Sequence, residues 1–205
     1  MLYTGEISHG TVLSEAMGLN GYKDNWYNIE EKYWDEALRI FERRTEMSLD
    51  DKEREPMKVI NYFESDKQEH WLEEIGKCDW GAGQFLHDLL KQGKLQEYVG
   101  DNVRVLMLVE GDELISFCTY AEKDDIQPTD LKPWMGWVYT FPQRRGHHYV
   151  GMLFEEIAKI AKTEDVHKIY ISTNHEGLYE KYGCEFYQIM NDIGGEPSRI
   201  YCKDL

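Results

Sequence analysis

Residues 138–151 read VYTFPQRRGHHYVG and concentrate basic residues and glycine in one segment of an acidic chain. The segment begins in an apolar run typical of a strand and ends in a pattern typical of a helix. A helix N-terminus offers unpaired backbone N–H groups and the positive end of a dipole, and both attract anions. Arg144, Arg145 and His147 add positive charge at the same place, and Gly146 allows close approach to the backbone. The stretch therefore predicts a site for a pyrophosphate-bearing ligand, with a merely solvated loop as the alternative.

Other ligand classes suit this stretch less well. The glycine patterns GxGxxG and GxxxxGK[ST] are both missing, which argues against a dinucleotide fold or a P-loop. His147 and His148 are candidate metal ligands, but adjacent residues at a helix start diverge by about 100°. Since no third ligand is evident, we expect no metal.

The rest of the chain alternates between strand-like and helical patterns. Acidic residues and a glycine at 110–113 separate two apolar runs, which indicates a hairpin. The order predicts a mixed sheet with helices on its faces, an α/β (α+β) fold. The predicted strands are 57–63, 104–109, 114–120, 134–141, 167–172, 186–190 and 199–203, and the helical segments are 65–90, 146–162 and 177–182.

The charge balance, the apolar runs and the cysteine pattern exclude several classes of partner. The chain has 205 residues, with 23 Lys and Arg against 39 Asp and Glu, a net charge of −16. Nucleic-acid binding relies on neutralising phosphates, so an acidic chain argues against that partner. No run approaches the roughly 18 apolar residues of a membrane span, and no secretory signal or CxxC pattern is present. We therefore expect a soluble, reduced, cytoplasmic protein without a membrane partner.

Residues 1–56 are predicted to form a helical N-terminal extension before a domain at 57–205. Apolar residues recur near a helical period over 28–44, with acids in the first turn. This face could cover a neighbouring domain or a second subunit, which leaves a homodimer open, although we favour packing on its own chain. The charged run 50–56 reads as a linker.

Two motifs resemble the GNAT superfamily of N-acetyltransferases. In the coenzyme-A loop pattern [QR]-x-x-G-x-[GA], Arg145 takes the first position, whereas His148 and Val150 replace the usual small residues. Downstream, residues 174–186 read NHEGLYEKYGCEF and are similar to the family's N…LYEKxGF segment. The two motifs occur in the family's order with a strand between them, and the resemblance covers 57–205.

The resemblance implies a twisted, mostly antiparallel sheet with helices on both faces, in which strands 134–141 and 167–172 splay apart. Acetyl-CoA, as a co-substrate, would enter that wedge. The implied coenzyme contacts are the backbone of Val138, Tyr139 and Thr140, the loop Arg144, Arg145, Gly146, His147, His148, Tyr149, Val150 and Gly151, and Asn174.

Tyr179 occupies the family position of the acid that protonates the departing thiolate, and packing of a short helix is its alternative role. No carboxylate lies on the strand 134–141, so a general base is harder to assign. We choose Glu122, with a water chain to solvent as the alternative. The acids at 124–130 could attract a cationic amine.

The sequence thus predicts an N-acetyltransferase that moves an acetyl group from acetyl-CoA to a primary amine of a small molecule or peptide, within a ternary complex. A non-catalytic, regulatory acyl-CoA-binding module is the alternative. We interpret Trp71, Trp80 and Phe85 as core residues rather than as contacts for the acceptor. The acceptor itself is not predicted, because fold does not fix function.

Overall fold

The structure, a computed structural model, describes residues 55–205. The predicted helix at 28–44 and almost all of the predicted extension 1–56 lie outside the described residues. Within them, seven strands form one sheet in the order β1-β2-β3-β4-β5-β7-β6. The strands are β1 Lys58–Asn61, β2 Arg104–Glu110, β3 Glu113–Ala121, β4 Trp134–Thr140, β5 Lys168–Thr173, β6 Glu185–Asn191 and β7 Pro197–Asp204.

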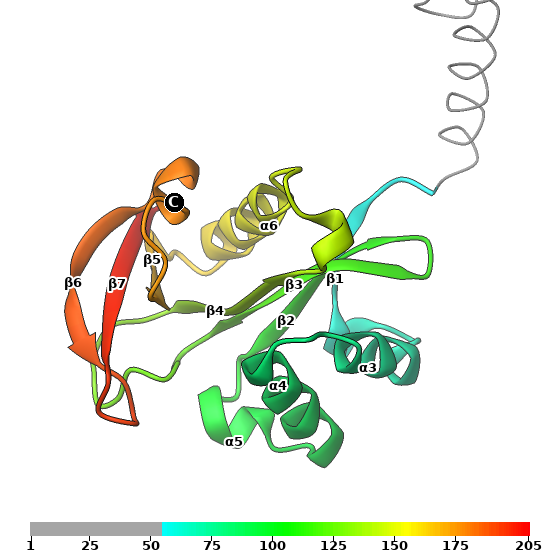
Figure 1. The fold of residues 1–205 in the computed structure, drawn as a ribbon, viewed down its shortest axis with the longest axis horizontal. Helices are drawn as coiled ribbons and strands as arrows, with labels where there is room; N and C mark the ends of the chain where they lie inside the picture. Colours follow the sequence, from blue (N-terminus) through cyan, green and yellow to red (C-terminus); the bar gives the residue numbers. More distant parts are fainter. Residues whose placement is uncertain (1–54) are drawn as a thin grey trace, which may run out of the picture. The chain divides into compact units, whose positions relative to one another are not determined.

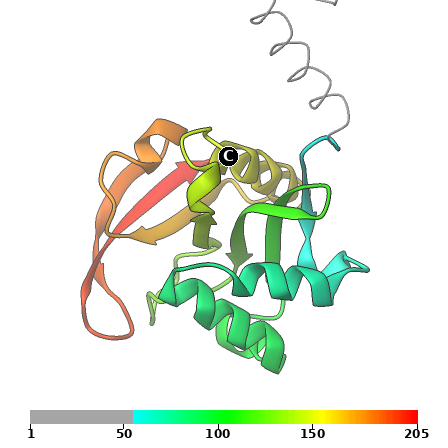
Figure 2. The same ribbon diagram turned by 45° about the vertical axis from the view of Figure 1, so that its right-hand side comes forward.

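Helices cover both faces of the sheet (Figures 1 and 2). One face carries α3, α4 and α5, and the other carries α6. Every pair of neighbouring strands is antiparallel except β4 and β5, which run parallel. The helices are α3 Gln68–Gly76, α4 Gly81–Gln92, α5 Leu95–Val99 and α6 Val150–Thr163, with 3-10 turns η2 Tyr62–Glu64, η3 Pro142–Arg144 and η4 Tyr179–Tyr182. The predicted fold is confirmed.

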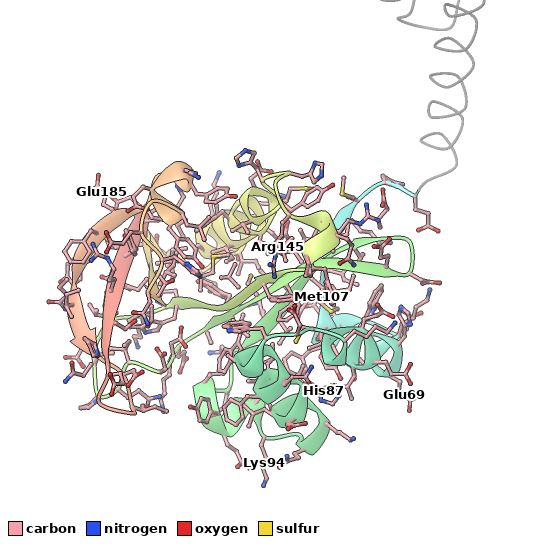
Figure 3. The ribbon with its side chains drawn as sticks, viewed as in Figure 1. Glu69, His87, Lys94, Met107, Arg145 and Glu185 are labelled. Carbon is pink, nitrogen blue, oxygen red and sulfur yellow. The ribbon has the colours of Figure 1, made fainter. Side chains whose placement is uncertain are left out.

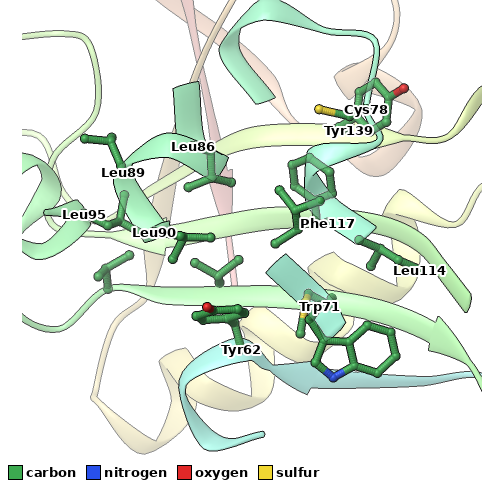
Figure 4. Close-up of a cluster of buried hydrophobic side chains, with 14 of the residues drawn as sticks. Tyr62, Trp71, Cys78, Leu86, Leu89, Leu90, Leu95, Leu114, Phe117 and Tyr139 are labelled. Atoms are coloured by element: carbon green, nitrogen blue, oxygen red, sulfur yellow. The ribbon is translucent and has the colours of Figure 1, made fainter. Parts of the chain in front are cut away.

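Strand β2, which lies between β1 and β3, contributes to both hydrophobic cores because successive side chains of a strand point to opposite faces. Val105, Met107 and Val109 join the cluster under α3, α4 and α5, which Figure 4 shows. Leu106 and Leu108 join the cluster under α6. A strand buried on both faces has an almost uninterrupted apolar sequence, and for that reason β2 was evident from the sequence.

Several predicted boundaries were wrong. The helix predicted from residue 146 begins at Val150, because Gly146 and His148 have positive φ angles of 86° and 59°, which no α-helix contains. His147 and His148 therefore precede the helix. The predicted strand 57–63 ends at Asn61, whose side chain accepts a hydrogen bond from the Phe63 N–H and starts a 3-10 turn. Helix α5 was not predicted, since five residues are too few to show a period.

The prediction that three aromatic residues are core residues was correct for one of them. Trp71 lies in α3 and is buried. Trp80 and Phe85 are 38% and 43% exposed, which corrects their assignment to the core. Trp80 precedes α4 and stacks on Tyr139 with 6.2 Å between ring centroids, whereas Phe85 packs edge-on against Tyr98 of α5. Both rings are therefore available to a ligand on this face of the sheet.

A bulge in β4 and a short pairing with β5 shape the centre of the sheet. Phe117 pairs with Tyr139 and Thr119 with Gly136, so two residues of β4 oppose one residue of β3. Trp137, inside the bulge, has a φ of 46°. Strands β4 and β5 pair through Trp134 and Tyr170 and then diverge, as Figure 1 shows. The predicted splay between these strands is confirmed.

Candidate active site

The splayed part of β4 has backbone groups available on its β5 side. Successive residues of an antiparallel strand direct their backbone groups to opposite sides. The Phe141 N–H donates to the Ile115 carbonyl of β3, so the preceding residue, Thr140, directs its backbone toward β5. The Tyr139 carbonyl accepts a hydrogen bond from the Ser116 hydroxyl at 2.7 Å. Contacts of Val138, Tyr139 and Thr140 with a coenzyme stay predictions, and the Thr140 carbonyl accepts a hydrogen bond from Arg145.

The loop between β4 and α6 presents consecutive backbone N–H groups. Among residues 55–205, no acceptor is found for the N–H groups of residues 146–150. Positive φ angles at Gly146 and His148 alternate with negative ones, a pattern that gathers N–H groups around an anion. The family's glycine at the position of His148 suits this left-handed conformation, which a histidine adopts with strain. The loop therefore has the backbone geometry of an anion site.

The two arginines of the loop have different surroundings. Arg145 is exposed, and its Nε donates to the Thr140 carbonyl at 2.9 Å (Figure 3 labels it). Arg144 points instead to the β2–β3 hairpin, where it forms ion pairs with Glu110 and Glu113 at 3.0 and 2.5 Å. The hydrogen bonds that Arg144 donates to the Glu113 carboxylate are the main cause that raises the pKa of Arg144. The Arg145 guanidinium lies over the Tyr139 ring, 5.6 Å from its centroid, and within residues 55–205 it forms no ion pair with a carboxylate.

Ring contacts join this loop to η4. His147 stacks on Tyr149 at 5.4 Å, and His148 lies edge-on to Tyr182 at 6.4 Å. A Cβ at Gly151 would lie 3.6 Å from the Tyr182 ring, so the first turn of α6 rests on η4. Asn174 is exposed just beyond the end of β5. The loop and the LYEK segment, separate in sequence, thus form one continuous surface.

Tyr179 is buried where η4 packs on the sheet. It is 5% exposed, and its ring lies near Phe154 of α6 and Tyr201 of β7. Burial is the main cause that raises its pKa, and negative charges at Cys118, Cys184 and Asp124 would raise it further. Cys118 is the residue that opposes the bulge of β4. Tyr179 therefore approaches the bulge from the α6 face, with its hydroxyl protonated at neutral pH.

Glu122 lies in a different setting. It is exposed, and its Oε1 accepts a hydrogen bond from Asn102 at 3.2 Å in the turn before β2. The carboxylate also lies against Gly100, 3.0 Å from where a Cβ would be. Its role as a base stays a prediction, and these contacts offer no link to Tyr179.

Sequence reasoning passed over Asp124 as a base, and the structure places it at the bulge. Its Oδ2 lies 2.7 Å from the position of a Cβ on Gly136, and Thr119 Oγ1 lies 3.0 Å from the same point. Burial raises the pKa of Asp124 to about 7, and the neighbouring Asp125 adds to the shift. The sequence signal was weak: an acid in an acidic loop and a glycine within a strand.

A crevice of about 400 Å³ adjoins the C-terminal end of β4. It is lined mainly by polar and charged side chains, including Glu74, Lys77, Asp79 and Glu113. The Tyr139 hydroxyl donates to Asp79 at 2.6 Å in its wall. The acids of the crevice give this face of the sheet a negative character.

Residues 55–205 contain neither a candidate metal cluster nor a candidate membrane-spanning helix. No group of three histidine, cysteine or acidic side chains there is placed to hold a metal ion. In the same residues no helix has the length and apolar character needed to cross a membrane.

Comparison with protein families places the chain. Residues 26–184 match the model of the acetyltransferase (GNAT) family. Because this match spans well over half of the sequence, the chain belongs to the GNAT acetyltransferase family. A search of curated protein sequences gives no match.

Solved structures support the same fold. The chain is similar to an acetyltransferase from Streptococcus agalactiae 2603, with 18% identity, 73% of this chain and 98% of that chain covered, and a TM-score of 0.51. It is also similar to a GNAT family acetyltransferase from Elizabethkingia anophelis with acetyl-CoA bound, with 11% identity, 73% of this chain and 98% of that chain covered, and a TM-score of 0.51. Aminoglycoside 6'-acetyltransferase type Ii is similar with 14% identity, 73% of this chain and 96% of that chain covered, and a TM-score of 0.51. At these identities the likeness concerns the fold.

Proposed function

We propose that this protein transfers an acetyl group from acetyl-CoA to a primary amine of a small molecule or peptide, by direct attack within a ternary complex. The observation that carries the proposal is the splay of β4 from β5 beside a loop with free N–H groups. Family membership supports acetyl transfer, and the similar proteins include one with acetyl-CoA bound and one named for aminoglycosides.

The residues at the two ends of the splay suit the two ends of the coenzyme. The N–H groups of residues 146–150 and the Arg145 guanidinium would hold the pyrophosphate, since charged hydrogen bonds of this kind are strong. The backbone of Thr140 would receive the pantetheine arm. Tyr179, whose pKa is raised by burial, would stay protonated at neutral pH and donate to the departing sulfur.

The charge and cysteines of the chain suit the proposed partners. A net charge of −16 favours the approach of a cationic amine and disfavours nucleic acid. All four cysteines are free and buried, which fits a reducing compartment such as the cytoplasm. Whether a second copy of the chain takes part stays a prediction.

The test is release of coenzyme A from acetyl-CoA across a panel of primary amines, with mass spectrometry of the acceptor. We expect thiol release that depends on the amine and one added acetyl group on the product. Release of equal size without an amine would indicate hydrolysis instead.

The alternative function, a regulatory acyl-CoA-binding module, is favoured by one observation. His148 keeps a strained left-handed conformation where the family pattern has glycine, so at this position, as at Val150, the loop departs from the family pattern. A thermal shift with acetyl-CoA but no transfer to any amine would support the module over the enzyme.

A further inference from the structure

The structure buries one carboxyl group that has no charged partner. Asp124 is 8% exposed, and among residues 55–205 no lysine, arginine or histidine forms an ion pair with it. Its Oδ1 accepts a hydrogen bond from the Asp125 N–H at 2.9 Å. Burying a carboxylate without a counter-ion is costly, so such a group either keeps its proton or receives a cation from a ligand.

This carboxyl group lies on the acceptor side of the bulge. Thr119 alternates with residues that face α6, and its hydroxyl lies beside Gly136 together with Asp124 Oδ2. Asp124 is therefore on the sheet face that carries α3, α4 and α5. Tyr179 packs on the opposite face, yet the charge of Asp124 raises its pKa. The two groups thus reach the bulge from opposite faces.

Aromatic rings lie on the same face of the sheet as the carboxyl group. Tyr98 of α5 lies edge-on to Trp137 of the bulge at 6.1 Å and to Phe85 of α4 at 5.4 Å. The Trp137 indole is held by a 2.8 Å hydrogen bond to the Ala82 carbonyl. Burial is the main cause that raises the pKa of Tyr98, and the charges of Asp125 and Asp124 add to it. A carboxylate beside aromatic faces is an environment that stabilises an ammonium ion.

We propose that Asp124 binds the ammonium group of the acceptor and takes one proton from it, which leaves a neutral amine beside the bulge of β4. This inference rests on the proposed function and names its acceptor class: a primary alkyl amine that is protonated in solution and whose carbon body contacts Tyr98 and Trp137. Glu122, exposed two residues earlier, has no part in this step.

In the proposed reaction, Asp124 accepts one proton from the alkylammonium ion, and the freed nitrogen lone pair forms a bond to the thioester carbonyl carbon. The carbon–sulfur bond breaks, and the sulfur takes a proton from the Tyr179 hydroxyl. The second nitrogen proton returns to Tyr179 through solvent, and Asp124 releases its own proton to solvent. The products are the acetamide, coenzyme A as the thiol and one proton.

The pH dependence follows from the groups that face Asp124. These are Asp125 in its own loop, Tyr98 from α5 and Tyr179 from η4, while Thr119 from β3 does not titrate. Both tyrosine pKa values are raised, so both rings are neutral at pH 7. Burial raises the pKa of Asp124 to about 7, so activity should rise through neutral pH as this group ionises.

The decisive variant is Asp124→Asn, which keeps the shape and removes the charge. For an alkyl amine we expect kcat/KM to fall by about 10²–10⁴-fold and the rise in activity near pH 7 to disappear. Hydroxylamine, which is unprotonated at neutral pH, should react with both proteins at rates within a few-fold of each other. Glu97→Gln removes an exposed carboxylate from α5, on the same face of the sheet, and serves as the control, with kcat/KM unchanged within threefold.

Two further results would overturn the inference. One is an unchanged pH profile in Asp124→Asn, and the other is loss of the thermal shift with acetyl-CoA in that variant, which indicates a structural role.

Calorimetry separates this inference from the proposed function. The wild type loaded with coenzyme A should bind butylammonium more tightly than Asp124→Asn does. Binding without any acetyl transfer contradicts the proposed function alone, whereas equal binding by both proteins contradicts the role of Asp124.

Discussion

The two loops that flank β4 differ in charge and in what forms them. The loop after β4 carries Arg145, and its backbone turns through left-handed conformations that leave N–H groups unpaired. The loop before β4 is acidic, and Asp124 within it is distinguished only by burial against Gly136. An anion site can therefore arise from local backbone conformation, whereas an unusual carboxyl group arises from contacts between distant parts of the chain.

The largest effect that we expect concerns the residue between the two loops. Tyr179→Phe keeps the ring and its packing but removes the proposed acid, so kcat should fall by about 10²–10⁴-fold. Acetyl-CoA affinity should change little, because the hydroxyl acts on charge that develops in the transition state. Steady-state kinetics and titration calorimetry measure the two quantities. Equal losses in both would assign the hydroxyl to positioning the coenzyme.

Asp124 in the acidic loop should make the free energy of unfolding depend on pH. The folded pKa of Asp124, about 7, lies above the roughly 3.9 of an unfolded aspartate, so wild-type stability is lost as pH rises between these values. Asp124→Asn should remove this loss and be more stable than wild type at pH 8, by up to roughly 4 kcal/mol. The difference should vanish near pH 4. Urea denaturation at both pH values tests this, and a gap independent of pH would contradict burial of the charge.

The basic loop offers a matched pair of arginines. Arg145→Ala should weaken acetyl-CoA binding about tenfold or more, since hydrogen bonds to charged groups contribute roughly 1.5–3 kcal/mol. Arg144→Ala should weaken it less than about threefold, because this guanidinium is already paired with Glu110 and Glu113. Titration calorimetry measures both. Equal losses would mean that Arg144 leaves its acids when the coenzyme binds.

The smallest effect concerns the contact that places Asp124. In Gly136→Ala the new Cβ would lie 2.7 Å from Asp124 Oδ2, so the carboxyl group must move. We expect a loss of about 1–3 kcal/mol in stability and a lower kcat/KM for the amine, with acetyl-CoA affinity retained. Gly81→Ala, at the first residue of α4 with nothing within 4 Å and no positive φ, is the control for a glycine substitution without a close contact. Unchanged kcat/KM in Gly136→Ala would separate Asp124 from the reaction.

Much of the fold could be predicted from the sequence because its signals are local. The apolar runs of β2 and β3 and the stripe of α6 follow the periods of a strand and a helix. Boundaries failed where backbone conformation overrode the pattern, as at His148, whose positive φ delays α6 to Val150. The sequence did not single out Asp124 for a different reason. Glu122 and Asp124 look equivalent in sequence, and only Asp124 is buried.

From the sequence alone we could predict the order of the strands, the helices other than α5, the GNAT motifs and a loop suited to an anion, because hydrophobic period and free N–H groups at a helix start are properties of short segments. Tertiary structure alone decided that Arg144 is paired, that Trp80 and Phe85 are exposed and that Asp124 lies beside Gly136. The physical reason is that the pairing, burial and pKa of a side chain depend on groups far away in the chain.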